Sequence, residues 1–387
     1  MNDVGEPHGD RAGFADYLAA LRFTGDVHAM PEGTVFFAEE PILRITAPLP
    51  EAQLVETVLL NLVHFQSMIA AKAARSVLAA EGRTLLDFGL RRAHGRDGGL
   101  LAARAAYIAG FTGTATALAA PLFGIPVFGT MAHSFIQAHD DEFEAFARFA
   151  EAHPQPATLL IDTYDTEAAA RKVVALAKRV ADRGIRIGAV RLDSGDLDAH
   201  ARRVRAILDE GGCRDMKICA SGNLDEHRIA GLVRAGAPID GFGVGTSLAT
   251  STDAPSLDVV YKLQEYAGKP RRKRSESKAT WPGVKQVFRR YDGEDRMQRD
   301  VVTSAGDTAP GTPLLEHVLK GGRRMRASEP LAHVRTRVTR ELERLPAALR
   351  DLMPAREAFQ VEIASSLRAL AQEMDRGEAV VHARNSS

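Results

Sequence analysis

From residue 84 onwards, short apolar runs alternate with segments of helical periodicity, and this alternation limits the fold more than any other feature of the chain. Strand–helix alternation over this length predicts parallel strands joined by right-handed crossovers. The runs are Thr84–Phe88, Ile125–Phe128, Thr158–Ile161, Arg186–Leu192, Met216–Ala220 and Ile239–Val244, with helices predicted near 97–120, 133–152, 165–183, 196–211 and 223–236.

A further apolar run, Leu257–Leu263, could add a seventh strand. Six or seven units favour an irregular six- or seven-stranded α/β barrel, and an open doubly wound sheet is the alternative. Before the alternation begins, apolar residues recur at helical spacing from Glu51 to about Ala80. This helix is apolar almost all round, so we expect it to be buried, with a subunit contact as one role for it. The barrel domain is therefore predicted over 49–264.

The segments on either side of the barrel have a different pattern. Residues 14–48 mix β-branched and aromatic residues with Pro and Gly, and the pattern after residue 264 is similar, so 14–48 and 265–325 together predict a small β domain. Charged amphipathic helices are expected over 326–378. The two ends, 1–13 and 379–387, are expected to be disordered.

Composition excludes several classes of protein. Lys+Arg and Asp+Glu balance at 50 each in 387 residues, so net charge gives no reason to expect a nucleic acid or an anionic membrane as partner. The basic run Arg271–Arg274 lacks interleaved aromatic residues and is interpreted as a solvated face. No apolar run approaches the ~20 residues of a membrane span, and the N-terminus has no apolar core of a signal peptide. With only Cys213 and Cys219, the chain has no disulfide framework or four-ligand zinc site, which indicates the reducing cytoplasm.

The predicted strands end in polar residues. In parallel α/β folds, functional residues gather at the carboxyl ends of the strands, so these side chains are expected to share one pocket. The first run ends in DFGLRRAH (87–94) and the second in GTMAHS (129–134). The later ones end in DTYDT (162–166), RLDSGD (191–196), SGN (221–223) and GVGTS (243–247).

Each of these residues also has an ordinary structural explanation. Asp165, Asp196 and Asn223 are interpreted as helix caps first, because Asp and Asn commonly precede helices. Asp162 and Asp193 come earlier, at the strand tips, and are harder to explain as caps. The convergence of six polar strand ends on one face makes a binding pocket the preferred interpretation.

The chemistry of this pocket follows from its residues. Backbone N–H groups at Ser221-Gly222 and at Gly243-Gly245 could bind a terminal phosphate. The basic side chains that could hold a carboxylate or a diphosphate are Arg91, Arg92, His94 and Arg191. Asp162 and Asp193 could bind ribose hydroxyls, act on Mg²⁺ indirectly or stabilise positive charge in a sugar ring, and Phe88 could stack on a flat ring. The sequence has no Walker-type P-loop and no GxGxxG motif.

The segment IPVFGTMAHS, Ile125 to Ser134, places a histidine where a predicted strand turns into a helix. Gly129 permits a sharp turn, and Thr130 or Ser134 could cap the helix that begins near His133. On its own, this histidine is more simply explained by hydrogen bonds near a helix start. The polar ends of the neighbouring strands make it a candidate functional residue.

These motifs resemble nicotinate phosphoribosyltransferases, members of the type II phosphoribosyltransferases. The matching segments occur in the family's order from about Arg22 to about Arg289. They include FTGDVHAMPEGTVFFAEEPILRI, DFGLRRAHG, GIPVFGTMAHSF, LIDTYDT, RLDSGDL, ASGNLDE, GFGVGTSLATS and YKLQEYAGKPRRKRSESKATWPGVKQVFR. So many segments in one order make a chance match very improbable.

The resemblance implies an α/β-barrel-like domain with a small β domain, in a cytoplasmic homodimer. The implied reaction joins nicotinate to 5-phosphoribosyl 1-diphosphate, giving nicotinate mononucleotide and diphosphate in NAD salvage. It implies ATP as a co-substrate and Mg²⁺ carried by the substrate diphosphate, with no metal bound directly by the protein. No nucleic acid or membrane partner is implied.

The resemblance also assigns roles to individual residues. His133 would be transiently phosphorylated by ATP, and Asp162 and Asp193 would complete the catalytic set. Phe88 would stack on the pyridine ring, while Arg91 and Arg191 would serve the carboxylate or diphosphate. The remaining expected substrate-binding residues are Arg92, Ser194, Gly195, Ser221, Gly222, Asn223, Gly243, Gly245 and Thr246, with the glycines cradling the 5-phosphate.

Two alternatives remain at this stage. Nicotinamide or quinolinate could be the substrate, although the GTMAHS and DFGLRRA motifs favour nicotinate. Relatives also begin with a further segment that carries an LLTDxYxLTM-like motif, whereas the match here starts near Phe14. The second alternative is therefore a catalytically impaired, N-terminally truncated homologue with a binding or regulatory role.

Overall fold

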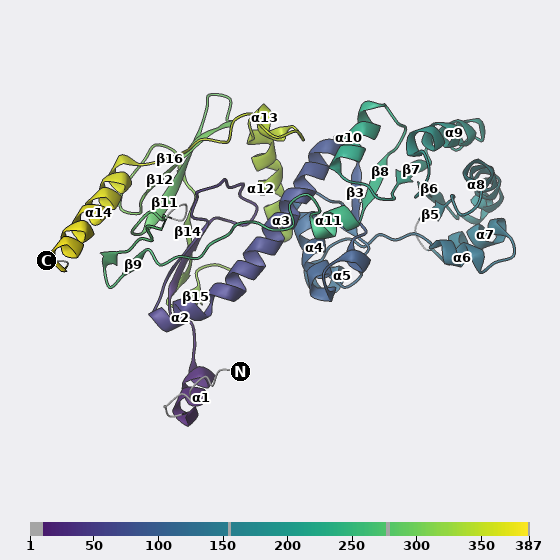
Figure 1. The fold of residues 1–387 in the computed structure, drawn as a ribbon. Helices are drawn as coiled ribbons and strands as arrows, with labels where there is room; N and C mark the ends of the chain where they lie inside the picture. The colour runs from purple at the N-terminus through teal and green to yellow at the C-terminus, as the bar shows by residue number, and fades with distance from the viewer. Residues whose placement is uncertain (1–10, 154–155, 276–278, 386–387) are drawn as a thin grey trace.

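A parallel sheet of six strands, curled into a half-barrel, occupies the right-hand part of Figure 1 in the computed structural model, which describes residues 11–153, 156–275 and 279–385. The strand order is β4-β3-β8-β7-β6-β5. The strands are β3 (Thr84–Asp87), β4 (Gly113–Thr114), β5 (Ala157–Leu160), β6 (Ile187–Leu192), β7 (Lys217–Ala220) and β8 (Gly241–Val244). The predicted parallel α/β architecture is confirmed.

Helices follow the strands and cover the outside of the half-barrel. Residues 90–92 form a short 3-10 turn, η1 (Leu90–Arg92), after β3, and η2 (Ala181–Arg183) follows α8. The helices are α4 (Arg96–Ala109), α5 (Ala119–Phe123), α6 (His133–Gln137), α7 (Glu142–Ala152), α8 (Thr166–Val180), α9 (Leu197–Glu210), α10 (Glu226–Arg234) and α11 (Thr246–Thr250).

Aspartate caps begin several of these helices. Asp165 and Asp196 accept hydrogen bonds from the backbone N–H groups of α8 and α9, which confirms both as caps. Asn223 is not a cap, because Asp225 caps α10 and Asn223 instead adopts a left-handed backbone conformation with φ of 51°. Helix α6 starts after Ala132 without a side-chain cap, so the predicted capping by Thr130 or Ser134 is wrong.

Two of the predicted strands are absent from the sheet. In Ile125–Phe128, only Val127 pairs, through a single bridge to Thr114, and the pairing strand at that edge is β4. The run Leu257–Leu263 forms no strand, and its apolar side chains Val260 and Leu263 are 66% and 54% exposed. The sheet therefore has six strands and stays open between the β4 edge and β5.

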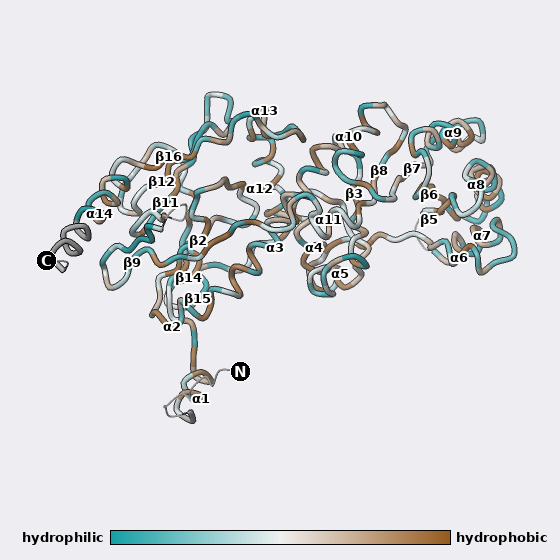
Figure 2. The backbone as a smooth tube through the Cα atoms, viewed as in Figure 1, coloured by the Kyte–Doolittle hydropathy of each residue, from teal (hydrophilic) through white to brown (hydrophobic). Residues whose placement is uncertain are grey.

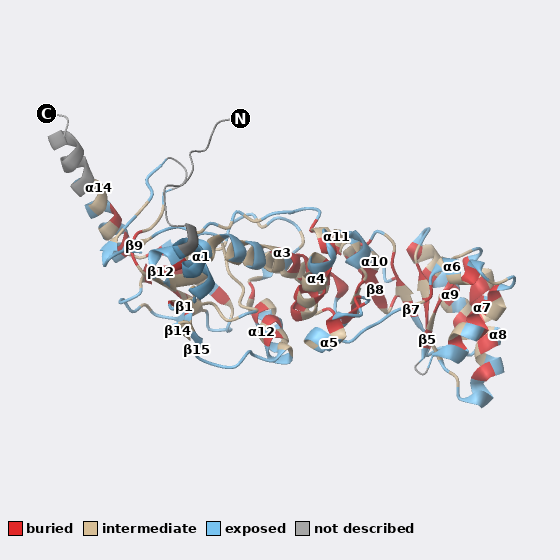
Figure 3. Ribbon diagram, turned by 90° about the horizontal axis from the view of Figure 1, so that it is seen from below, coloured by how far each residue is buried: buried red, intermediate tan, exposed pale blue. Residues whose placement is uncertain are grey.

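The predicted helix from Glu51 to Ala80 is divided into α2 (Leu49–Leu54) and α3 (Glu56–Ala80). Its second half packs against α4, α10 and β3, and Ile69 and Ala73 are fully buried there. Its first half is not buried as expected, because Val58 is 61% exposed, and Leu54 and Leu62 are exposed as well (Figure 3). By length and composition, Leu49–Ala80 could also cross a membrane, contrary to the sequence-based expectation, although core helices of soluble proteins pass the same test.

The small β domain combines segments from both sides of the half-barrel, and it includes a strand at 361–363, within the region 326–378 where only helices were predicted. One sheet joins the N-terminal strands β1 (Asp26–Ala29) and β2 (Leu43–Thr46) to later ones, in the order β15-β14-β1-β2. A second sheet has the order β13-β11-β12-β16, and β9 pairs with β10. The later strands are β9 (Glu265–Tyr266), β10 (Lys269–Pro270), β11 (Lys285–Tyr291), β12 (Met297–Ser304), β13 (Thr312–Pro313), β14 (Glu316–Lys320), β15 (Arg323–Arg324) and β16 (Val361–Ile363).

Helices occupy both ends of the chain. Helix α1 (Arg11–Ala20) stands apart from the β domain in Figure 1, and α12 (Leu331–Arg344), α13 (Ala347–Arg350) and α14 (Ser365–Asn385) follow the β domain. Disorder was predicted for 1–13 and 379–387. Residues 1–10 and 386–387 lie outside the described residues, whereas 11–13 and 379–385 belong to α1 and α14.

The main hydrophobic core lies between the half-barrel strands and their helices. Val190 and Leu192 of β6 are fully buried, as are Val173 and Leu176 of α8 and Phe146 of α7. Hydrophobic segments run through these strands in Figure 2. This core fixes the strands, so that the connections after their carboxyl ends form the rim on which the site is built.

Candidate active site

The start of α6 and the connections after β5 and β6 bring His133, Asp162 and Asp193 together at the rim of the half-barrel. The Nε2 atom of His133 lies 4.0 Å from Asp162 Oδ1 and 4.0 Å from Asp193 Oδ2. The His133 side chain is 42% exposed, whereas that of Asp162 is 1% exposed. A partly accessible imidazole thus faces two carboxylates, one of them deeply buried.

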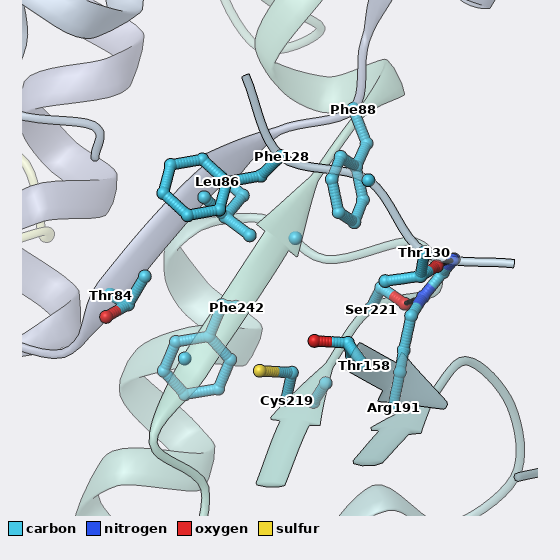
Figure 4. A pocket seen from close by; sticks show the side chains of 14 residues that line it. Thr84, Leu86, Phe88, Phe128, Thr130, Thr158, Arg191, Cys219, Ser221 and Phe242 are labelled. Carbon is cyan, nitrogen blue, oxygen red and sulfur yellow. Dashed lines mark hydrogen bonds between the residues drawn. The ribbon is translucent and has the colours of Figure 1, made fainter. Parts of the chain in front are cut away.

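Arg191 holds the centre of this arrangement. Its guanidinium donates hydrogen bonds of 2.7 Å each to Ser221 Oγ, Thr130 Oγ1 and Asp193 Oδ1. Figure 4 shows the Arg191 side chain reaching toward Thr130 and Ser221, beside the ring of Phe88. Because a guanidinium has donors fixed in one plane, these contacts hold three connections in one position.

Asp162 links the connection after β5 to the connection after β6. Its Oδ2 atom accepts hydrogen bonds from the backbone N–H of Asp193 at 3.0 Å and from Ser194 Oγ at 2.5 Å. Its Oδ1 atom is buried and has no hydrogen-bond partner among the described residues. A buried carboxylate oxygen without a partner is costly, so Asp162 presents an unused acceptor to His133.

The charge on Asp193 is stabilised by its surroundings. Burial alone would raise the pKa of this carboxyl group. The hydrogen bond from Ser221 and the positive charge of Arg191 outweigh burial and hold the pKa of Asp193 below its ordinary value. Asp193 therefore stays ionised in neutral solution and supplies a fixed negative charge at the rim.

Phe88 and the glycines after β7 and β8 form the floor beside this cluster. The Phe88 ring lies against Gly243, where an added Cβ would come within 2.4 Å of the ring, and 5.3 Å from the Arg191 guanidinium carbon. Gly222 has a φ of +97°, and a Cβ there would lie 2.0 Å from the Asp193 carbonyl oxygen. Only glycine permits this close approach of the two connections.

Other predicted site residues line the same rim without joining this hydrogen-bond network. Gly195, with a φ of +77°, faces His200, and Gly245 packs near the Phe88 carbonyl. The exposed members of this group are Arg91, Arg92, His94, Gly195, Asn223 and Thr246. Their predicted roles stay predictions.

Four further residues contribute to the site although no individual role in it was predicted for them, namely Asp87, Thr114, Thr130 and Thr163. His133 Nδ1 lies 3.0 Å from Thr163 Oγ1, and Thr130 binds Arg191. Buried Asp87 accepts hydrogen bonds from Gly89 N–H and Thr114 Oγ1, and so fixes the turn that carries Phe88. Burial raises the pKa of Asp87. Position at a strand tip was the available signal for Asp87 and Thr163, as it was for Asp162.

The described residues do not form a ready-made metal centre. No group of three or more His, Cys, Asp or Glu side chains among them is arranged to hold a metal ion. Two carboxylate oxygens at the rim face His133 and could accept a ligand. They are Asp162 Oδ1 and Asp193 Oδ2. Two carboxylate oxygens suit a magnesium ion that arrives with a phosphate ligand and keeps most of its other ligands.

Two protein-family models match the chain. The nicotinate phosphoribosyltransferase (NAPRTase) N-terminal domain matches residues 10–64, and the nicotinate phosphoribosyltransferase (NAPRTase) family matches residues 84–288. The second match spans β3 to β11 and includes every residue of the cluster described above.

Characterised relatives carry the same name. Nicotinate phosphoribosyltransferase pncB2 of Mycobacterium tuberculosis is 48% identical over 355 residues, which cover 92% of this chain and 76% of the relative. The nicotinate phosphoribosyltransferase of Bacillus subtilis is 46% identical over 269 residues, covering 68% of this chain and 54% of that protein.

A solved structure has a similar fold. Human nicotinic acid phosphoribosyltransferase superposes with a TM-score of 0.83 at 29% identity, covering 95% of this chain and 86% of the human chain. The family models, the relatives and this structure agree with one another and with the motifs on the rim. The chain belongs to the nicotinate phosphoribosyltransferase family.

Proposed function

We propose that this chain transfers the phosphoribosyl group of 5-phosphoribosyl 1-diphosphate to nicotinate, giving nicotinate mononucleotide and diphosphate for NAD salvage. The family and the names of its relatives support this reaction. The observation that carries it is the position of His133 Nε2, 4.0 Å from carboxylate oxygens of both Asp162 and Asp193. In this proposal, the sugar and its diphosphate meet beside this imidazole nitrogen and the two carboxyl groups.

The carboxylates suit the chemistry at the sugar. Displacement at C1 passes through a state with positive charge on the ring, and a fixed negative charge nearby lowers the energy of that state. Asp193 is held ionised by Ser221 and Arg191, so its charge is present before the substrate binds. Preorganised charge of this kind needs no rearrangement during the reaction.

The floor of the site suits the two ends of the substrates. Phe88 offers a flat face for the pyridine ring, and Arg191 and Arg91 supply positive charge for its carboxylate or for the diphosphate. The backbone at Gly222, Gly243 and Gly245 would accept the 5-phosphate, since glycines let a phosphate approach N–H groups closely. Mg²⁺ would enter on the diphosphate and screen its charge as it leaves.

We further propose that ATP hydrolysis is coupled to this transfer through a transient phosphate on His133. A neutral imidazole nitrogen is nucleophilic near neutral pH, and the His133 side chain is 42% exposed, so a phosphoryl donor can reach it. A phosphate at this position adds negative charge beside the diphosphate site. That change alters the relative affinities for substrate and product, which links ATP to the equilibrium.

We also propose that the chain works as a cytoplasmic homodimer. Six apolar side chains in the N-terminal part of the chain are exposed, namely Phe14, Tyr17, Leu18, Leu54, Val58 and Leu62. These residues lie on α1, α2 and the first half of α3, and an apolar surface of this kind commonly marks an interface. Light scattering after size exclusion tests this proposal, and a single-chain mass at high concentration would refute it.

A competition among pyridines tests the choice of substrate. Purified protein is given nicotinate, nicotinamide and quinolinate together with 5-phosphoribosyl 1-diphosphate, ATP and Mg²⁺, and the mononucleotide products are separated. We expect nicotinate mononucleotide to dominate. Equal or faster use of nicotinamide or quinolinate would reject nicotinate as the substrate, and no product from any of them would favour a binding role for the chain.

Labelling with γ-³²P ATP tests the phosphohistidine separately. We expect acid-labile label on the wild type and none on His133→Ala. Equal labelling of both proteins would place the phosphate elsewhere, while the pyridine competition would be unaffected by that result.

A further inference from the structure

The environments of the two ring nitrogens of His133 differ sharply. Nε2 faces open carboxylate oxygens of Asp162 and Asp193, each at 4.0 Å. Nδ1 faces the hydroxyl of Thr163 at 3.0 Å. That hydroxyl has no other hydrogen bond recorded within the described parts of the chain. The proton position on the ring is therefore decided between two carboxylates and one hydroxyl.

A hydroxyl differs from the partner that usually fixes a histidine. A carboxylate only accepts, so it holds the proton on the nitrogen that it faces, whereas a threonine hydroxyl can both donate and accept. With Thr163 as acceptor, Nδ1 carries the proton and Nε2 has a free lone pair. With Thr163 as donor, Nδ1 accepts and the proton sits on Nε2, facing the carboxylates.

We propose that Thr163 is a positioning residue whose hydroxyl allows His133 to exchange between these two tautomers, and that it directs phosphorylation to Nε2. The proposal rests on the phosphohistidine proposed above. Between turnovers, an Nε2 proton is stabilised by the Asp162 and Asp193 carboxylates. For reaction with ATP, the Thr163 hydroxyl rotates and accepts from Nδ1–H, which leaves the Nε2 lone pair available.

The chemical step balances with ATP as the co-reactant. The Nε2 lone pair attacks the γ-phosphorus, the bond from that phosphorus to the bridging oxygen breaks, and ADP leaves with the electron pair. Nδ1 keeps its proton throughout and donates a hydrogen bond to Thr163 Oγ1. The product is the τ isomer of phosphohistidine, with phosphorus on Nε2. Attack by Nδ1 would require the ring to give up its contact with Thr163.

The position of Thr163 makes this proposal testable by mutation. Thr163 lies in the connection between β5 and α8, next to Asp162 and before the cap residue Asp165. Its side chain is half-buried, and the cap hydrogen bond of α8 comes from Asp165 rather than from Thr163. Thr163→Val preserves shape and removes the hydroxyl, while Thr163→Ser preserves the hydroxyl.

The experiment compares the wild type, Thr163→Val, Thr163→Ser and His133→Ala. Each full-length protein is labelled with γ-³²P ATP and Mg²⁺, and the phosphohistidine isomers are resolved after alkaline hydrolysis. ¹⁵N chemical shifts of the His133 ring report the tautomer before ATP is added. Thermal unfolding of each variant shows whether the fold is intact.

We expect the wild type and Thr163→Ser to give the τ isomer. Thr163→Val should label about tenfold more slowly, the size expected for loss of one hydrogen bond of about 1.4 kcal/mol, with some label moved to the π isomer. Its ¹⁵N shifts should show one fixed tautomer. A π isomer in the wild type, or equal rates and isomers in Thr163→Val, would overturn the proposal while leaving the phosphohistidine itself intact. No label on the wild type would instead refute the phosphohistidine and, with it, this inference.

Discussion

Two clusters in this molecule combine arginine with carboxylates, and they differ in how completely their charges are satisfied. The rim cluster is His133, Asp162, Arg191 and Asp193. The buried ion cluster lies in the β domain, where Arg289 of β11 binds Asp300 of β12 and Glu341 of α12, with Glu40 alongside. Arg289 and Asp300 are fully buried, whereas the Asp193 side chain at the rim is 25% exposed.

The two clusters use the same chemical groups for different purposes. Arg289 neutralises carboxylates from two elements, so the buried ion cluster joins β11, β12 and α12. At the rim, Asp162 and Asp193 each keep one oxygen that faces His133 instead of an arginine. Residual acceptors at an accessible edge indicate a site that is completed by ligands. A buried cluster in which one arginine binds carboxylates from two other elements indicates a structural role.

The largest effect on stability is expected from Arg289→Met. Removing one partner leaves Asp300 buried without its counter-ion, which should lower the free energy of unfolding by about 3–5 kcal/mol. Urea unfolding measures this change. Arg148→Met is the matched control, because Arg148 and Glu144 form an exposed pair worth at most about 1 kcal/mol. Similar losses in the two variants would contradict the distinction between paired interior and exposed charges.

Asp193→Asn should lower activity strongly and change stability little, the reverse of Arg289→Met. It removes a preorganised negative charge at the rim, so turnover should fall by about 10²–10³, while the unfolding midpoint changes little. Steady-state kinetics with nicotinate and a urea titration measure the two quantities. Asp165→Asn is the control, since asparagine also caps helices well and Asp165 is exposed at the start of α8. An unaltered rate in Asp193→Asn would remove Asp193 from the site.

Most of the rim cluster could be predicted from the sequence, whereas the buried ion cluster of the β domain could not. The strands β3, β5, β6, β7 and β8 were found because strands buried on both faces have continuous apolar runs. Asp162 and Asp193 directly follow such runs and Arg191 lies near the end of one, so their meeting at one edge followed from parallel topology. Glu341 lies 52 residues from Arg289, and no periodicity in the sequence indicates that Arg289 pairs with Asp300 and Glu341.

The errors at the half-barrel have identifiable physical causes. Ile125–Phe128 has the composition of a strand, yet Val127 and Phe128 are 46% and 39% exposed, and the pairing edge belongs to the short strand β4. Strand β4 consists of only Gly113 and Thr114, which is too short to produce a periodic pattern in the sequence. Thr163 was missed for a different reason, because threonine before a helix is ordinary turn chemistry, and its contact with His133 depends on the tertiary structure.

The pH dependence of stability offers another way to separate the clusters. Burial, together with neighbouring Asp300, raises the pKa of Glu40 from 4.5 to about 9, so Glu40 is protonated in the folded protein at neutral pH. The unfolded chain binds fewer protons between these two values, so this contribution to stability is complete below pH 4.5 and is lost as pH rises toward 9.

Glu40→Gln should therefore make stability fall less steeply with pH. Urea unfolding of the wild type and the variant from pH 6 to about 9 measures the two slopes, and their difference removes other titrating groups common to both. Asp193 has a lowered pKa, so its contribution to stability is present at neutral pH and is lost only as the pH falls into the acid range, outside this titration. Parallel slopes for Glu40→Gln and the wild type would mean that Glu40 is already ionised in the folded protein at neutral pH.

Two glycine substitutions test whether the packing of the backbone at the rim is as specific as the arrangement of its charges. Gly222 and Gly184 both have left-handed backbones, with φ of +97° and +72°. A Cβ on Gly222 would lie 2.0 Å from the Asp193 carbonyl oxygen, whereas a Cβ on Gly184 would meet nothing within 4 Å.

Gly184→Ala should therefore lower the free energy of unfolding only by the conformational cost of about 1–2 kcal/mol. Gly222→Ala should lose this conformational cost and, because its Cβ also overlaps the Asp193 carbonyl oxygen, a further amount of about 1–3 kcal/mol, and it should displace Asp193. Comparison of unfolding free energies with KM for 5-phosphoribosyl 1-diphosphate checks this, because only Gly222→Ala should change KM. A changed KM in Gly184→Ala, or an unchanged one in Gly222→Ala, would show that this contact does not set the position of Asp193.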